Sequence, residues 1–214
     1  IHKEEKLNFS KVTTFNLDEY YGLAPSHEQS YYYFMQENLF KGLNIPDGQI
    51  NVPSGLAKNV EKFCAHYEEM IKRAGGIDLQ VLGIGGDGHI GFNEPGSSLG
   101  SRTRFKTLTE ETIRDNAKLF FNDKTDEVPK FCITMGVGTV MDAKRCLLLA
   151  NGARKSTVLA EAVEGPVTAQ ITASILQMHP DTIVICDQEA AGKLKRKDYY
   201  NHVEKMTAEL LKMK

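Results

Sequence analysis

Three titratable side chains lie within eight residues of one another in the segment LGIGGDGHIGFNEPGSS. They are Asp87, His89 and Glu94, and the glycines between them permit tight turns. A histidine flanked by two carboxylates is typical of a general acid or base whose ring is oriented and whose charged form is stabilised by a neighbour. The segment therefore predicts proton-transfer chemistry. A purely structural turn would explain the glycines but not the three titratable groups.

The same segment allows two other interpretations. Asp, His and Glu can all bind a metal, but no second His or Cys lies at ligand spacing. Gly83, Gly85 and Gly88 match the dinucleotide pattern GxGxxG. That pattern requires a helix that begins at the third glycine and an acidic residue ~20 positions further on, at the end of a second strand. The residues after Gly88 do not resemble the start of a long helix, so nicotinamide binding is not favoured.

A second pair of carboxylates, Asp18 and Glu19, lies in the segment NLDEYYGL, directly after residues 12–15, which are rich in β-branched side chains. Binding crevices of open α/β sheets lie outside the carboxyl ends of the strands. A carboxylate at this position could take a proton from carbon. Alternatively, Asp18 or Glu19 caps the helix that is expected to begin near Ser26, since Asp and Ser both serve as N-caps.

These residues would be positioned by an alternation of strands and helices. Short apolar runs rich in β-branched residues predict strands that are covered on both faces, and longer segments with helical spacing lie between them. This alternation predicts an α/β fold with a mostly parallel sheet and helices on both faces, a Rossmann-like three-layer sandwich in a single domain, residues 1–214. The expected strands are residues 12–15, 79–84, 131–135, 146–150 and 182–186, and the expected helices are residues 27–43, 56–74, 109–121, 155–163 and 194–213.

Composition restricts the class of partner. The 214 residues carry 26 Lys and Arg against 28 Asp and Glu, a net charge of −2, so no overall basic field attracts nucleic acid. Four widely spaced cysteines without a C-x-x-C pattern are expected to be reduced thiols. No apolar stretch approaches the ~18 residues of a membrane span, and no apolar leader opens the chain. We expect a cytoplasmic protein that does not bind membranes.

Three segments, NLDEY, LGIGGDGHIGFNEPGSSLGSRTR and GVGTVMDA, resemble the glucosamine-6-phosphate deaminase family. The resemblance covers nearly the whole chain. It implies conversion of glucosamine 6-phosphate and water into fructose 6-phosphate and ammonia, in N-acetylglucosamine catabolism, without a metal or organic cofactor. It also implies that Asp18 moves a proton from C2 to C1 through an enolamine. His89 would open the sugar ring, and Asp87 and Glu94 would orient it.

The resemblance also implies residues that bind the sugar phosphate. Lys155 would hold the phosphate, and Lys118 stands where relatives often carry Arg. A lysine offers a point charge in place of the planar fork of arginine, so weaker geometric control is expected there. An exposed helix lysine without a role is the alternative for Lys118. The glycines Gly83, Gly85 and Gly86 complete the expected substrate site.

Some bacterial relatives are activated by N-acetylglucosamine 6-phosphate, and some are hexamers. The residues that match their effector contacts are Ser97, Arg104, Lys106 and Thr107. We therefore expect a homo-oligomer with a second phosphate site. The same residues could instead form a subunit interface or a solvated strand.

Relatives carry a further strand and helix, with a phosphate-binding Gly/Thr/Ser-rich loop, before the position of Ile1. Such a unit needs about 30 residues, and we expect the sequence given to lack it. Two alternative functions remain open. One is a hydrolase like 6-phosphogluconolactonase, against which the NLDEY and FNEPGSS segments count. The other is a sugar-phosphate sensor without catalysis.

Overall fold

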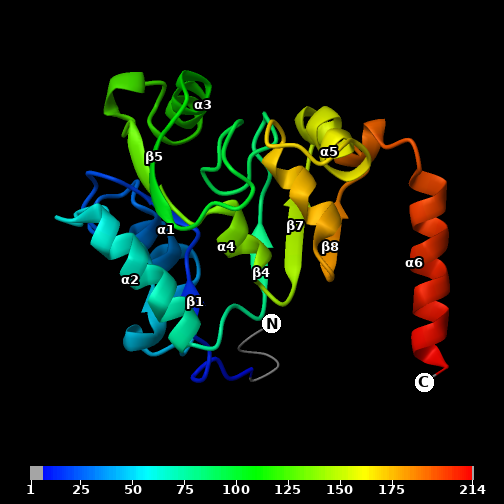
Figure 1. The fold of residues 1–214 in the computed structure, drawn as a ribbon, viewed down its shortest axis with the longest axis horizontal. Coiled ribbons are helices and arrows are strands. Elements are labelled where there is room, and N and C mark those ends of the chain that lie inside the picture. The colour runs from blue at the N-terminus through cyan, green and yellow to red at the C-terminus, as the bar shows by residue number, and fades with distance from the viewer. Residues whose placement is uncertain (1–6, 214) are drawn as a thin grey trace.

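The computed structural model describes residues 7–213. Over these residues the protein contains three small sheets with helices around them (Figure 1). The strands are β1 (Thr14–Phe15), β2 (Asp18–Tyr20), β3 (Ile50–Asn51), β4 (Gln80–Leu82), β5 (Arg104–Thr107), β6 (Phe131–Thr134), β7 (Cys146–Ala150) and β8 (Thr182–Cys186). The helices are α1 (Tyr31–Asn38), α2 (Val60–Arg73), α3 (Glu110–Phe120), α4 (Val137–Met141), α5 (Ser156–Glu164) and α6 (Lys197–Lys212). The α/β class expected from the sequence is confirmed.

A parallel sheet in the order β4-β7-β8 lies at the centre of the largest core. Leu82 of β4 and Leu148 of β7 are buried in one core cluster with side chains of two helices. These are Val140 of α4 and Leu159 of α5. Burial of such side chains stabilises a fold by roughly 1.5–3 kcal/mol each. This core fixes the end of β4, from which the segment with His89 departs.

The prediction that these strands are covered on both faces is wrong for the described residues. Val81, Leu149, Ile183 and Ile185 are 41–56% exposed. The register pairs Val81 with Leu147 and Leu147 with Ile183, and it pairs Leu149 with Ile185. Alternate side chains of a strand point to opposite faces, so these residues share one face of the sheet. No described helix buries that face.

The sheet β2-β6-β5 is antiparallel, which corrects the expectation of one mostly parallel sheet. Asp18 is the first residue of β2 and pairs with Thr134 of β6, so it lies in a strand and not in the expected loop. The strand β5 corresponds to the solvated strand that was one alternative for Arg104, Lys106 and Thr107. A separate parallel pair joins β1 to β3.

Capping signals set the helix ends close to their predicted positions. The Thr109 side chain accepts a hydrogen bond from the N–H of Thr112 at the start of α3, as its sequence position predicts. At the end of α2, Gly75 and Gly76 adopt φ values of +90° and +85°, which glycine tolerates without strain. The expected helix 27–43 is shorter than predicted, because α1 begins only at Tyr31.

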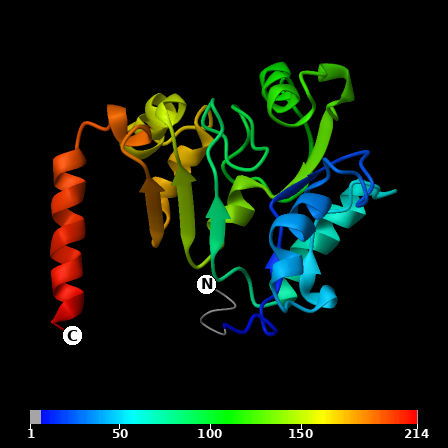
Figure 2. The ribbon, with the colours of Figure 1, turned by 180° about the vertical axis from the view of Figure 1, so that it is seen from behind.

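Two helices stand away from the central sheet. The helix α3 lies above β5 on one side of the molecule, and α6 stands apart on the opposite side, as both views of the ribbon show (Figures 1 and 2). No helix of the part that the structure describes is long and apolar enough to cross a membrane.

Candidate active site

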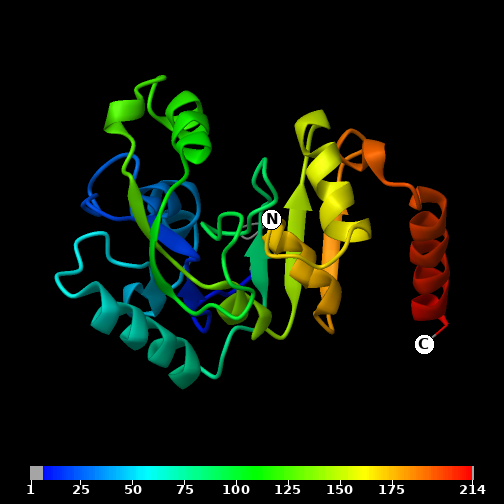
Figure 3. The ribbon, with the colours of Figure 1, turned by 45° about the horizontal axis from the view of Figure 1, so that its top comes forward.

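Residues 83–103 run from β4 to β5 without a helix and lie between α3 and α5 (Figure 3). The dinucleotide pattern therefore lacks the helix that it requires at Gly88. Gly88 has φ +88°, and a Cβ added there would collide with Ile171. Gly91 has φ +56°, and a Cβ added there would lie close to the side chains of Asp18 and Thr134. The turn at Gly91 thus brings this segment against β2 and β6.

His89 is held between the two carboxylates predicted to flank it. Its Nδ1 atom lies 2.7 Å from Oδ1 of Asp87 and 3.5 Å from Oε2 of Glu94. The contact with Asp87 is short but not aligned as a directed hydrogen bond, so it acts mainly as an ion pair. Burial opposes a charge on the ring, but the two carboxylates outweigh it and raise the pKa of His89 to about 9. At neutral pH the ring is an imidazolium.

The two carboxylates differ in their own surroundings. Asp87 accepts a hydrogen bond from the backbone N–H of His89 at 3.1 Å. Burial acts to raise the pKa of Asp87, but contact with His89 lowers it overall. Glu94 is only 2% exposed and accepts a bond from the backbone N–H of Thr109 at 3.3 Å. The imidazole is therefore anchored from a tight turn on one side and from the start of α3 on the other.

Asp18 faces this loop from strand β2. Its Oδ2 atom lies 3.4 Å from the position of a Cβ added at Gly91, two residues after His89. Burial and the charge of Glu19 raise the pKa of Asp18 to about 7, against the lowering effect of His89. The residue as a whole is half-buried. An ionised Asp18 is thus a base of near-neutral strength next to a cationic acid.

Glu19, and not Asp18, forms the cap that the sequence left open between them. Its Oε1 atom accepts from the backbone N–H of Tyr31 at 2.9 Å, and its Oε2 atom accepts from that of Tyr32 at 3.0 Å. The hydroxyl of Ser30 caps the same helix through the N–H of Tyr33. The capped helix is α1, so Asp18 is free for another role.

Three polar side chains that the sequence analysis missed fix the loop. Asn93 is fully buried, and its amide donates to the carbonyls of Ile90 and Met135. The hydroxyl of Thr134 accepts from the N–H of Phe92, and that of Thr172 donates to the carbonyl of Asn93. Asn93 lies inside a recognised motif, whereas nothing local in the sequence indicates Thr134 or Thr172. Their partners are 42 and 79 residues away.

Of the expected phosphate ligands, Lys155 lies at the loop and Lys118 lies on α3. The Lys155 amine donates to the carbonyl of Ile84 at 2.7 Å, and burial lowers its pKa. Lys118 is exposed and makes no hydrogen bond or ion pair with any residue of the described part. Asp115, one helical turn before Lys118, lies beside Gly86 and influences the charge of Lys155. That side of α3 therefore faces the loop.

The three expected substrate-binding glycines have different surroundings. Gly83 and Gly86 are exposed, and a Cβ at Gly83 would meet nothing. A Cβ at Gly85 would collide with Cε1, Nδ1 and Nε2 of His89. The imidazole ring therefore lies directly on the backbone of Gly85.

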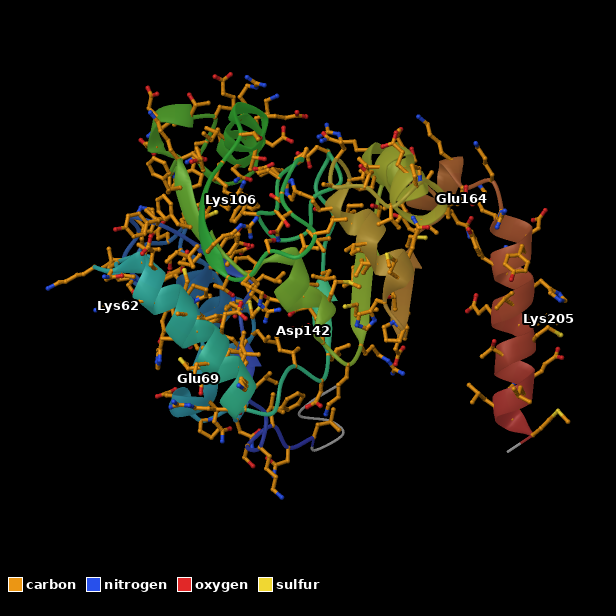
Figure 4. All side chains as sticks on the ribbon, in the orientation of Figure 1. Lys62, Glu69, Lys106, Asp142, Glu164 and Lys205 are labelled. Carbon is orange, nitrogen blue, oxygen red and sulfur yellow. The ribbon has the colours of Figure 1, made fainter. Side chains whose placement is uncertain are left out.

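The four residues expected at an effector site do not form one cluster. Arg104 and Lys106 lie on the same face of β5, and Thr107 lies on the other face, because side chains alternate along a strand. Lys106 is labelled on this strand in Figure 4. The Ser97 hydroxyl is enclosed and has no hydrogen-bond partner among the described residues. Arg104 donates to the side-chain oxygen of Asn93 at 2.8 Å, which connects β5 to the loop of His89.

The cluster of Asp87, His89 and Glu94 is compact enough for a cation, with ligand atoms within 4.8 Å of one another. However, the nitrogen that faces both carboxylates is Nδ1, and the raised pKa of His89 favours a proton on the ring. A ring nitrogen between two carboxylates suits a site of proton transfer.

Comparison with known proteins identifies the family of the chain. The family model described as glucosamine-6-phosphate isomerases/6-phosphogluconolactonase matches residues 1–185. A Clostridium botulinum (strain Langeland) protein named glucosamine-6-phosphate deaminase is 53% identical over 197 residues, which are 92% of this chain and 80% of that protein. One of the same name from Shewanella woodyi is 51% identical over 205 residues, 96% of this chain and 77% of that protein.

Solved structures give the same result. A monomeric glucosamine-6-phosphate deaminase has a TM-score of 0.86 and 41% identity, covering 90% of this chain and 79% of that one. A 6-phosphogluconolactonase from Trypanosoma cruzi has a TM-score of 0.69 over 91% of this chain and 78% of that one, but its 21% identity shows a shared fold alone. The chain belongs to the glucosamine-6-phosphate isomerase/6-phosphogluconolactonase family.

Proposed function

We propose that the protein is a glucosamine-6-phosphate deaminase, an aldose-ketose isomerase that converts glucosamine 6-phosphate and water into fructose 6-phosphate and ammonia. One observation carries the proposal: Asp18, with a pKa near 7, lies against Gly91 in the loop of His89, and the charge of the His89 imidazolium acts on its pKa. A near-neutral base and a cationic acid at one site suit proton transfers on a sugar at physiological pH. The relatives named as deaminases, at about half identity, support the same reaction.

The proposed reaction begins with opening of the sugar ring. His89 gives a proton to the ring oxygen and takes one from the C1 hydroxyl, so C1 becomes an aldehyde; Asp87 and Glu94 stabilise the charged form of His89 beforehand. Asp18 then takes the proton from C2 while His89 gives a proton to the aldehyde oxygen, which forms the enolamine. Asp18 returns its proton to C1, and the amine gives a proton back to His89, which leaves an imine at C2. Water adds to the imine carbon, the new hydroxyl proton moves to nitrogen, the C–N bond breaks, and ammonia leaves with fructose 6-phosphate as the product. Asp18 and His89 end the cycle in their starting protonation states.

Binding of the phosphate is proposed for Lys155, with Lys118 at the edge of the site. Lys155 is half-buried at the carboxyl end of β4, where its amine lies beside the loop of His89. Lys118 has no partner of its own in residues 7–213, so it is available to a phosphate. Gly83 and Gly86 leave the backbone open for close approach of a ligand.

Replacing Gly85 with alanine is expected to lower kcat by about 10²-fold, the lower range of a general acid-base contribution. The added methyl group occupies the position of the His89 ring and moves it away from Asp87. Gly48→Ala is the matched control, since a Cβ there meets no atom and Gly48 is not among the residues assigned to the site. Ammonia release at pH 8 measures both variants, and equal rates would contradict the assigned position of His89.

The whole chain is proposed to act as one catalytic domain, and the proposed location is the cytoplasm. All four cysteines are free thiols, which is typical of a reducing compartment.

We further propose that Arg104 and Lys106 bind the phosphate of an effector such as N-acetylglucosamine 6-phosphate in an oligomer. Their shared face on β5 supports this, and the rate as a function of added effector tests it. Ser97 and Thr107 are left out of this effector site, because the Ser97 hydroxyl is buried and Thr107 lies on the other face of β5.

The proposal is tested by measuring the products. Glucosamine 6-phosphate should yield ammonia and fructose 6-phosphate in equal amounts. Hydrolysis of 6-phosphogluconolactone without ammonia release would favour the lactonase alternative. Binding of the sugar phosphate without turnover of either substrate would favour a sensor.

A further inference from the structure

We infer that Glu19 is a positioning residue for the proposed isomerisation: its carboxylate fixes β2 against the start of α1 and places a negative charge behind Asp18. The inference rests on the proposed function, because it assumes that Asp18 is the base. It concerns a side chain that no substrate would touch.

The carboxylate of Glu19 is surrounded by backbone donors. The residue is 2% exposed. Its Oε1 atom accepts from the N–H groups of Tyr20 and Tyr31 at 2.8 and 2.9 Å, and Oε2 accepts from that of Tyr32 at 3.0 Å. Both carboxylate oxygens therefore accept hydrogen bonds, and the side chain connects the short strand β2 to the first turn of α1. Bonds from N–H groups to a carboxylate are roughly twice as strong as neutral ones.

Glu19 and Asp18 face opposite ways from the same strand. They are neighbours in β2, paired with Ile133 and Thr134 of β6, so their side chains alternate across the sheet. Asp18 faces the loop at Gly91, and Glu19 faces the start of α1. Glu19 thus lies behind Asp18 as seen from the loop. A fixed charge so placed acts on the base without occupying the substrate site.

The other titratable groups near Asp18 come from four further elements of the structure. Tyr31 (α1), Tyr67 (α2) and Cys132 (β6) face it together with its strand neighbour Tyr20, and burial raises the pKa of each, so all are neutral at pH 7. The remaining group is His89, from the loop after β4. Its charge lowers the pKa of Asp18, whereas the charge of Glu19 raises it. Burial is the largest cause of the raised pKa of Asp18, and Glu19 is the charge that adds to it and opposes the effect of the imidazolium.

The variant Glu19→Gln separates charge from shape. Glutamine has the same size and keeps one acceptor oxygen, but it removes the negative charge. Without that charge Asp18 ionises at lower pH, so the acid limb of the kcat/KM profile should move down by about one pH unit. Glu19→Asp keeps the charge and should leave the limb in place, even if its shorter side chain loosens α1. Glu28→Gln is the matched control, because Glu28 is exposed just before α1.

The pH profile of kcat/KM for these three variants is the test. A limb that moves in Glu19→Gln but in neither of the others supports the inference. An active Glu19→Gln protein with an unmoved limb overturns it, as does a Glu19→Gln protein that fails to fold while Glu19→Asp folds, which would assign Glu19 to folding alone. Absence of ammonia release by the unmodified protein would instead contradict the proposed function, so the two failures are distinguishable.

Discussion

Replacing Asp18 with asparagine is expected to lower the rate of ammonia release by about 10³-fold, within the range of a general base. Asparagine has the size of aspartate but cannot accept the C2 proton. The binding of the sugar phosphate should change little, because Lys155 and the loop glycines remain. The steady-state rate with glucosamine 6-phosphate at pH 8 measures the effect, and Asp126→Asn, at an exposed position, is the control.

The same variant should be more stable than the unmodified protein at pH 8. The pKa of Asp18 is about 7 in the folded protein and about 3.8 in the unfolded chain, so ionisation of the folded form costs free energy. The cost is absent below pH 4, grows between pH 4 and pH 7, and is complete above pH 7. Because Asp18 is partly exposed, we expect a gain on the order of 1–3 kcal/mol, below the full value of the shift. Urea unfolding at pH 4 and pH 8 measures it.

Two results would contradict this account of Asp18. One is a variant that keeps more than a tenth of the rate, since a general base contributes about 10² or more. The other is a loss of stability at pH 8 together with no change at pH 4. That pattern would mean that ionised Asp18 stabilises the fold through favourable ionic contacts, whereas the account requires that its ionisation costs free energy.

Replacing His89 with glutamine is expected to lower kcat by about 10²- to 10³-fold. Glutamine cannot supply a proton to the ring oxygen. Loss of the imidazolium also leaves Asp87 and Glu94 near each other without a cation between them. The carboxylates then repel, so some stability is lost above the pKa of Asp87. The effect should appear in kcat more than in KM, because the proposed phosphate ligand is the separate side chain of Lys155.

His66→Gln is a matched control for this variant, since His66 lies on the exposed side of α2. Rates and KM values for both variants with glucosamine 6-phosphate measure the effect. An unchanged kcat in His89→Gln would remove His89 from the mechanism. A rise in KM alone would assign it to binding of the sugar.

Local signals in the sequence predicted local structure well. The cap at Thr109, the stop at Gly75 and Gly76 and the strand at residues 182–186 depend on near neighbours, and all appear as expected. The close grouping of Asp87, His89 and Glu94 also follows from short spacing and glycine turns. These features need no knowledge of the tertiary fold.

Long-range pairing was beyond such reasoning. Asp18 was expected in a loop, but pairing with Thr134 makes it part of an antiparallel strand. The role of Gly85 depends on the position of the His89 ring, and the role of Glu19 depends on the start of α1 twelve residues later. The apolar runs of β4, β7 and β8 predicted burial on both faces, but burial depends on which helices pack there. Apolar sequence alone does not determine that.

The central claim is that an ionised Asp18 and a protonated His89 act on the same sugar. The pH profile of kcat/KM tests it most directly, for the unmodified protein and for Asp87→Asn. We predict a bell with an acid limb near pH 7 and an alkaline limb near pH 9, set by the pKa values of the two groups. Asp87→Asn should shift only the alkaline limb to lower pH, because Asp87 raises the pKa of His89. Full activity maintained below pH 5, or an alkaline limb that Asp87→Asn leaves in place, would contradict the claim.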